Sequence, residues 1–240
     1  MYFLCIDFGN SLTKLAIFRN DKIVHFEAQK IIEIKLLEHL VKKYGIEYSI
    51  ISSVKSIKPG IKNYLRKHTI FKEMSVDLSI PLTIKYETPD SLGNDRLAAV
   101  CAAHRLYPHM NILVIGIGTC ITYDILSKRK AYLGGSISPG LDMRLKAMHQ
   151  FTSKLPLVAK NTEVGLLGKN TTNAMQSGAL WGMKAEINGM IAYYQSKYSN
   201  LNIILSGGGA EYFKKRLKKP IFAHPNLVLL GLHYILSLNV

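Results

Sequence analysis

The sequence predicts an α/β protein built from two similar halves. Each half opens with three strand patterns, after which helix and strand patterns alternate. A turn that contains glycine and polar residues follows the first strand of each half. A chain of 240 residues accommodates two domains of ordinary size. We therefore expect one domain at 1–108 and a second at 109–240, with the break near Pro108.

The elements of the first half follow from the spacing of apolar residues. Apolar runs predict strands, and apolar residues three or four positions apart predict helices. Ile34, Leu37 and Leu40 provide this spacing in the first helix. The predicted strands are 2–7, 12–19, 22–28 and 49–54, and the predicted helices are 33–44, 59–67 and 93–107.

The second half repeats this order. It opens with the apolar run Asn111–Ile117, and Gly118 begins the turn that follows. The repeat predicts that each half supplies one ligand-binding hairpin to a shared cleft. The predicted strands are 111–117, 121–126, 131–137 and 202–205, and the predicted helices are 140–151, 172–198, 209–218 and 226–238.

Composition narrows the class of protein. A content of 48% hydrophobic and 20% charged residues indicates a globular protein with a sizeable core. No apolar run reaches the roughly 18 residues of a membrane span, and the N-terminus has no basic leader of a signal peptide. The cysteines (Cys5, Cys101 and Cys120) are odd in number and far apart, which argues for a reducing compartment and against a zinc site. We expect a cytoplasmic protein.

The chain is strongly basic, with 31 Lys and Arg against 16 Asp and Glu and a net charge of +15. Such a charge favours either nucleic acid or anionic small substrates. The densest basic clusters, 128–130 and 214–219, are short and lie beside predicted turns or on a helix. We interpret them as solvated surface rather than as a nucleic-acid site.

The tip of the first hairpin carries residues that suit a nucleotide polyphosphate. Gly9 lets the backbone approach a ligand closely, and backbone N–H groups beside Asn10 and the Ser11 hydroxyl can bind phosphate oxygens. Asp7 can hold Mg²⁺, and Lys14 supplies a positive charge. The alternative is an ordinary turn, because Gly and Asn are common turn residues.

Two further glycine turns follow buried strands in the second half. Gly118 and Thr119 form the tip of the second hairpin, and Gly207 to Gly209 connect a strand to a helix. A glycine turn at a helix N-terminus lets a phosphate or a flat ring lie against the backbone. The alternatives are a plain β-turn at Gly118 and a flexible connection at Gly207.

The segment Tyr86–Arg96 is a candidate for catalysis. Asp95 and Arg96 fall in the first turn of a predicted helix, where a carboxylate is also favoured by the helix dipole. Beside a polyphosphate, Asp95 suits the orientation or deprotonation of an attacking hydroxyl, and Arg96 suits an anionic or polar substrate. Helix capping and charge balance are the alternative.

Together these motifs resemble those of type III pantothenate kinases, in the actin-like, RNase H-like ATPase superfamily. The family pattern Asp-x-Gly-Asn-Thr-x-x-Lys matches Asp7–Lys14, with Ser11 in place of Thr. The pattern Tyr-x-x-Pro-x-x-Leu-Gly-x-Asp-Arg matches Tyr86–Arg96. Further matches are 134–140, 155–156, 171–178, 206–208 and 229–232.

The resemblance implies two duplicated RNase H-like domains with mixed sheets flanked by helices. It also implies ATP- and Mg²⁺-dependent phosphorylation of pantothenate, the first step of coenzyme A synthesis, by a homodimer with its active site at the interface. Asp95 would be the general base on the pantothenate hydroxyl. Nucleotide contacts would come from Asp7, Gly9, Asn10, Ser11, Lys14, Thr119, Gly207 and Gly208, and pantothenate contacts from Tyr86, Gly93, Asn94, Arg96 and Thr171. For Thr171, which would come from the partner subunit, the alternative is a helix N-cap.

One departure from the family pattern concerns a monovalent cation. The family usually has Asp in the second hairpin where this chain has Gly116, and that Asp binds K⁺ or NH₄⁺. Glycine offers no carboxylate, so we expect activity with weak or no potassium dependence.

Two rival functions stay open at this point. The first is a non-catalytic regulatory relative that associates with nucleic acid. The net charge suits it, whereas the intact Asp7, Lys14, Asp95 and Arg96 argue against it. The second is a kinase of the same superfamily that acts on another small hydroxyl compound.

Overall fold

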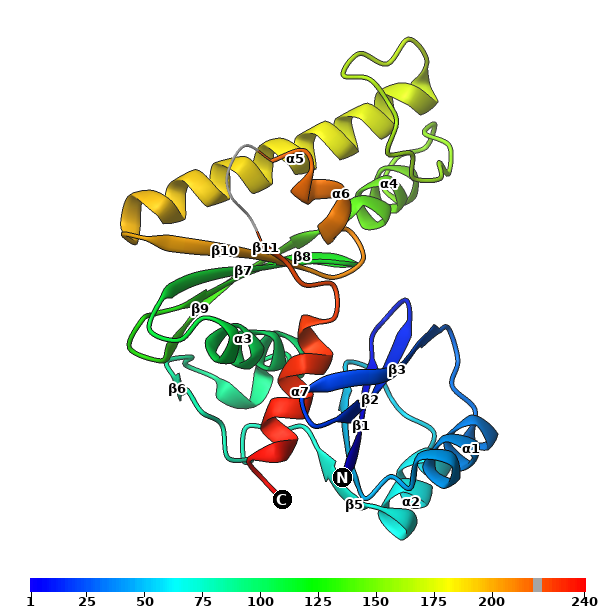
Figure 1. Cartoon of the computed structure of the whole chain (residues 1–240). Helices are drawn as coiled ribbons and strands as arrows, with labels where there is room; N and C mark the ends of the chain where they lie inside the picture. The colour runs from blue at the N-terminus through cyan, green and yellow to red at the C-terminus, as the bar shows by residue number, and fades with distance from the viewer. Residues whose placement is uncertain (218–221) are drawn as a thin grey trace. The chain divides into compact units, whose positions relative to one another are not determined.

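The computed structural model describes residues 1–217 and 222–240, which form two compact units (Figure 1). The first unit comprises Met1–His109, Leu126–Gly134 and Asn226–Val240. The second comprises Met110–Ile125 and Gly135–Pro225. The first passage between the units therefore lies close to the predicted break at Pro108. The division into domains 1–108 and 109–240 stays a prediction.

The first unit contains a five-stranded sheet in the order β3-β2-β1-β4-β5. The antiparallel pairs β1–β2 and β2–β3 form one side, and the parallel pairs β1–β4 and β4–β5 form the other. The sheet is therefore mixed, as predicted. Its strands are β1 (Tyr2–Phe8), β2 (Thr13–Arg19), β3 (Lys22–Gln29), β4 (Tyr48–Ser53) and β5 (Ile70–Glu73).

Helices cover both faces of this sheet because alternate residues of β1 point to opposite sides. Leu4 and Ile6 pack in a core with α1 (Ile34–Tyr44) and α2 (Pro59–His68). Phe3 lies on the other face, where α7 (Leu227–Ser237) contacts β1. Asp7 shares the alternation of Phe3 and therefore points to the α7 side of the sheet.

Helix α7 packs closely on α3 (Asn94–Leu106) within the same unit. A Cβ added to Gly231 of α7 would lie 1.8 Å from the Ala98 carbonyl oxygen. Only glycine permits this approach of the two helices, which holds α3 in its position.

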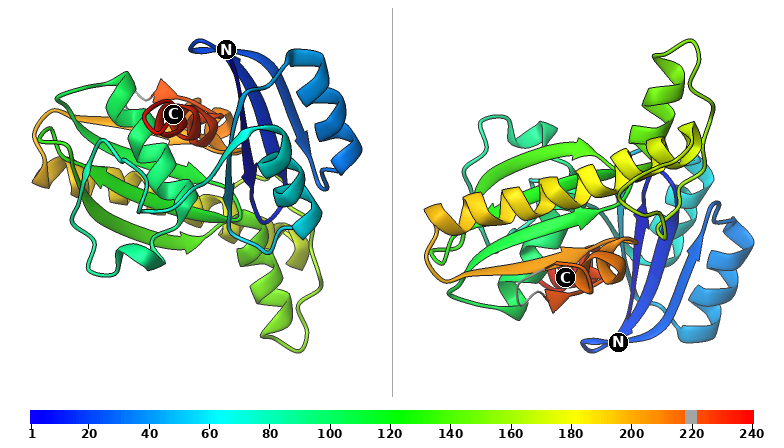
Figure 2. Two further views of the ribbon diagram at one scale, coloured as in Figure 1. Left: turned by 90° about the horizontal axis from the view of Figure 1, so that it is seen from below. Right: turned by 90° about the horizontal axis from the view of Figure 1, so that it is seen from above.

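A second sheet has the order β11-β10-β7-β8-β9-β6, and β9 runs from the first unit into the second. Helix α5 (Thr171–Lys197) runs along strands of this sheet in the second unit (Figure 2), with Leu180, Met183 and Ile187 in its core. The remaining elements are β6 (Thr83–Ile84), β7 (Asn111–Ile117), β8 (Cys120–Leu126), β9 (Ala131–Pro139), β10 (Leu201–Ser206), β11 (Phe222–Ala223), α4 (Leu141–Gln150) and α6 (Ala210–Lys214).

The predicted strands and helices are confirmed, with boundary shifts of a few residues. The helix predicted at 209–218 ends at Lys214, and Lys218 and Lys219 lie outside the described residues. Three short strands (β5, β6 and β11) and a 3₁₀ helix at Pro89–Ser91 were not predicted. In the described part of the chain, no helix combines the length and apolar character needed to cross a membrane.

Candidate active site

Asp7 lies at the end of β1, between two polar partners on neighbouring strands. The strand register places Lys14 opposite Asp7 on β2 and Ser52 opposite it on β4. The Asp7 Oδ1 atom is buried and has no hydrogen-bond partner. Burial, and then the charge of Asp95, raise the pKa of Asp7 to about 7, although Lys14, Ser52 and Lys55 act in the opposite direction.

A buried carboxylate oxygen without a donor is suited to a metal cation, so Asp7 fits the predicted Mg²⁺. Within residues 1–217 and 222–240, no group of three or more His, Cys, Asp or Glu side chains comes together. Mg²⁺ usually takes one or two carboxylates and completes its shell with water and substrate phosphates.

The hairpin after Asp7 combines a fixed turn with exposed polar groups. A Cβ added to Gly9 would lie 2.9 Å from the Leu12 carbonyl oxygen, so the turn requires glycine. Asn10 and Ser11 at the tip are exposed. The predicted phosphate-binding groups are therefore accessible.

Asp95 lies at the start of α3, in the same unit as Asp7. Its Oδ1 accepts the Arg96 backbone N–H at 2.9 Å, and a Cβ added to Gly93 would lie 2.8 Å from that oxygen. Glycine thus leaves room for the Asp95 carboxylate above the helix N-terminus. The N-cap position belongs to Gly93, so Asp95 is not the N-cap residue, although it does satisfy one N–H group of the first turn.

Arg96 is almost fully buried and lies among aromatic rings of the first unit. Its Nη2 donates to Tyr132 Oη at 3.0 Å, and its guanidinium lies 5.9 Å from the centre of the Tyr86 ring. Gly134, at φ 97°, brings the backbone close to the Tyr86 ring: an added Cβ would be 3.6 Å from Cδ2. The structure therefore brings Tyr86 and Arg96 together, and their contact with a substrate stays a prediction.

The Asn94 side chain forms a hydrogen bond within the protein: its Nδ2 donates to the Met74 carbonyl oxygen at 2.9 Å. This bond anchors the start of α3 to the segment that follows β5. A contact between Asn94 and a substrate stays a prediction.

In the second unit, the two predicted glycine turns pack against each other. Gly118 N–H donates to the Cys120 carbonyl at 2.9 Å and closes the hairpin that carries Thr119. Gly207 has φ 85°, and its added Cβ would lie 2.5 Å from the Ile117 carbonyl oxygen. Gly209 N–H donates to the same oxygen at 3.1 Å. These contacts hold the turn against the end of β7 and favour a fixed turn over a flexible connection.

Gly116 lies on β7 of the same unit. A Cβ added there would lie 2.6 Å from Thr122 Oγ1 on β8. The Thr122 hydroxyl therefore takes the space in which a longer side chain would begin.

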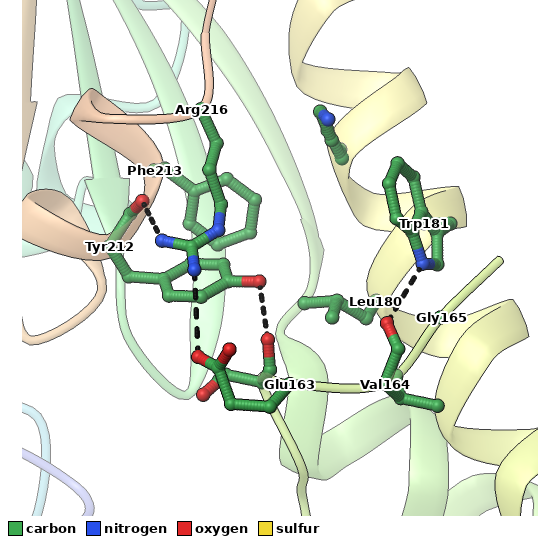
Figure 3. Close-up of a pocket in the computed structure, with 10 residues that line it drawn as sticks. Glu163, Val164, Gly165, Leu180, Trp181, Tyr212, Phe213 and Arg216 are labelled. Atoms are coloured by element: carbon green, nitrogen blue, oxygen red, sulfur yellow. Dashed lines mark hydrogen bonds and ion pairs between the residues drawn. The ribbon is translucent and has the colours of Figure 1, made fainter.

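A cavity of about 250 Å³ lies beside α6, the helix that begins after the glycine turn (Figure 3). Arg216 covers the Tyr212 ring at 3.8 Å, and its Nη2 lies 3.5 Å from Glu163 Oε1. On the other side, Trp181 Nε1 donates to the Val164 carbonyl at 3.2 Å.

The cavity was not predicted from the sequence. Arg216, which was expected on the solvated surface, is partly exposed and also packs over the Tyr212 ring. The signal available was an aromatic pair, Tyr212 and Phe213, separated by two residues from the glycine turn that follows a buried strand.

Thr171 is the exposed first residue of α5. The N-cap is Asn170, whose Oδ1 accepts the Asn173 N–H at 2.8 Å. The alternative of Thr171 as the helix N-cap is therefore wrong, and its hydroxyl is accessible to solvent.

Comparisons with known structures identify the fold. The chain is similar to the inorganic polyphosphate/ATP-glucomannokinase of an Arthrobacter species, with TM-score 0.53, 11% identity and coverage of 100% of this chain and 99% of that one. It is also similar to a Campylobacter jejuni protein described as a Baf family transcriptional activator, with TM-score 0.61, 20% identity and coverage of 98% and 97%. At these identities the likeness shows the fold alone, which is that of actin-like ATPases and sugar kinases.

Sequence comparison identifies the family within this class. The family model described as type III pantothenate kinase matches residues 3–193. A type III pantothenate kinase of Christiangramia forsetii is 40% identical over 240 residues, which covers 98% of each chain. This chain belongs to the type III pantothenate kinase family.

Proposed function

We propose that this protein transfers the terminal phosphoryl group of ATP to the primary hydroxyl of pantothenate and so catalyses the first step of coenzyme A synthesis. Membership of the family supports this activity. The observation that carries it in the structure is the pair Asp7 and Asp95. Asp7 has a buried oxygen without a partner, and the charge of Asp95 helps to raise its pKa.

On the nucleotide side, phosphoryl transfer depends on position and on charge neutralisation. We assign Gly9, Asn10, Ser11 and Lys14 to the phosphates, because the hairpin presents polar groups and a cation beside Asp7. Asp7 would hold Mg²⁺, which would neutralise phosphate charge when bound. Thr119, Gly207 and Gly208 of the second unit are assigned to the same nucleotide.

On the acceptor side, Asp95 is the general base. One of its oxygens accepts the Arg96 N–H, and we assign Oδ2 to the hydroxyl proton of pantothenate. The buried Arg96 guanidinium supplies charge for the pantothenate carboxylate, and Tyr86 orients it. Gly93, Asn94 and Thr171 complete the predicted contacts.

The cavity beside α6 is the place we assign to the base of the nucleotide. The Arg216 guanidinium and the Trp181 ring supply flat surfaces for a stacked ring, and Tyr212 lies three residues beyond Gly209 of the glycine turn. Its small volume suits one ring system rather than a whole nucleotide. Tyr212→Ala should weaken ATP binding more than pantothenate binding.

We also propose that the protein works as a cytoplasmic homodimer in which Thr171 reaches the partner's pantothenate site. Figure 1 shows the long segment that leads from α4 to α5. Its exposed large apolar side chains are Phe151, Leu157, Leu166 and Leu167. Large apolar side chains that are exposed on one segment are available for contact with another subunit. Light scattering that shows only monomers at the enzyme's working concentration would contradict the dimer.

ATP consumption by the purified protein with Mg²⁺, measured with and without pantothenate, tests the proposed function. Pantothenate-dependent turnover is the expected result. Turnover with another small hydroxyl compound alone would indicate a different kinase. DNA binding that weakens with salt, without any turnover, would favour the regulatory alternative.

A further inference from the structure

The second unit contains a polar network that joins four elements, α4, α5, β8 and β9. Arg144 on α4 forms an ion pair with Glu186 on α5, and Tyr123 on β8 donates to Glu186 Oε1 at 2.8 Å. The Arg144 side chain also donates to the Pro139 carbonyl at 2.8 Å and to Ser138 Oγ at 3.1 Å, both at the end of β9.

The network is largely shielded from water, so water competes little for its hydrogen bonds. The exposed fraction is 21% for the Arg144 side chain, 27% for that of Glu186 and 1% for Tyr123. Burial would raise the pKa of Glu186, but hydrogen bonds from Arg144 and Tyr123 outweigh it and the pKa is lowered. The carboxylate is therefore charged, and it fixes the orientation of the guanidinium fork.

The Arg144 guanidinium binds the end of β9, and the turn that follows at Gly140 contacts the Gly118–Thr119 hairpin. Gly140, next to Pro139, donates its N–H to the Thr119 carbonyl at 3.0 Å. A Cβ added to Gly140 would lie 2.4 Å from the Gly118 carbonyl oxygen and 2.6 Å from that of Thr119. A shift of Pro139 and Gly140 is thus transmitted directly to the backbone of the hairpin tip.

We propose that Arg144 and Glu186 are positioning residues that hold the Gly118–Thr119 tip in the conformation that binds the nucleotide phosphates. Neither is assigned to the substrates. The consequence for ATP rests on the proposed function, whereas the effect on the backbone does not. An ordinary structural ion pair would lower stability without acting on this particular turn.

Glu186→Gln tests the proposal first, because it keeps the size of the side chain and places an amide where Arg144 needs an acceptor. Arg144→Met alone would leave the partly buried Glu186 carboxylate without its counter-charge and could prevent folding. The second variant therefore combines Arg144→Met with Glu186→Gln. Arg144→Lys keeps the charge but not the fork. Asp142 lies on α4 like Arg144, and Asp142→Asn is the matched control because it removes only an exposed ion pair with Lys160.

Amide hydrogen exchange measures how often the backbone N–H groups of this turn lose their hydrogen bonds. In the folded Glu186→Gln protein, exchange at Gly118 and Gly140 should accelerate by about tenfold, while amides of β1 keep their rates. The dissociation constant of ATP should rise by about tenfold with the KM for pantothenate unchanged, and Arg144→Lys should share this effect. Asp142→Asn should match the parent in both measurements.

Parent-like exchange at Gly118 and Gly140, or parent-like ATP affinity, in the Glu186→Gln and double variants would overturn the proposal. Failure of the parent protein to bind ATP would overturn the proposed function instead. The exchange measurement would then still decide whether the ion pair holds the turn.

Discussion

Replacement of Asp7 by Asn tests the electrostatics of the first hairpin. The pKa of Asp7 is raised from 3.8 to about 7, chiefly by burial and then by Asp95. The folded protein therefore binds this proton more tightly than the unfolded chain does. Its stability falls as the pH rises from about 4 to about 7. At 1.36 kcal/mol per pKa unit, the full cost above pH 7 is about 4 kcal/mol.

Asparagine resembles the protonated carboxyl group in size and charge, so Asp7→Asn should remove this cost. We expect the variant to gain stability over the parent, and the gain should grow by about 2.5 kcal/mol between pH 5 and pH 8. Urea unfolding at several pH values, without Mg²⁺ or nucleotide, measures the difference.

Two comparisons make this test specific. Glu38→Gln removes an exposed carboxylate on α1 and should show no pH-dependent gain of this size. On an Asp95→Asn background the gain from Asp7→Asn should be smaller, because Asp95 is the second cause of the raised pKa. A gain that does not change with pH, or a loss of stability at pH 8, would refute the reasoning.

Three further predictions concern turnover and stability. Asp95→Asn should still bind ATP while turnover falls by about 100-fold or more, as for loss of a general base, and near-normal turnover would remove Asp95 from that role. Turnover should persist in potassium-free buffer and change little with added K⁺, since Gly116 offers no carboxylate; a rate near zero without K⁺ would contradict this. Burial lowers the pKa of His233, which favours its neutral ring in the folded state. Stability should therefore fall as the pH drops below about 6.5, and urea unfolding of His233→Gln should show a smaller fall; an equal fall would assign the effect to other groups.

Local sequence patterns predicted most of the fold because the strands and helices are long enough to show their periodicity. The strands β6 and β11, of two residues each, show none. They exist because their backbones pair with β9 and β10, which are distant in sequence. Local sequence patterns also did not predict that helix α6 ends at Lys214.

The candidate site was predictable where a short motif carries the chemistry, as at Asp7–Lys14 and Tyr86–Arg96. The raised pKa of Asp7 was not, because it depends on burial and on Asp95, which is remote in the chain. The same holds for the bond between Arg144 and Glu186, which are 42 residues apart. The sequence shows which residues are charged, but their interaction partners are known only from the folded structure.

The most direct test of the central claim is to identify the product formed from pantothenate, ATP and Mg²⁺ by mass spectrometry. The account predicts phosphopantothenate in amounts that match the ADP released, and almost none with Asp95→Asn. ATP consumption without a phosphorylated pantothenate, or no reaction by a folded protein that binds ATP, would contradict it.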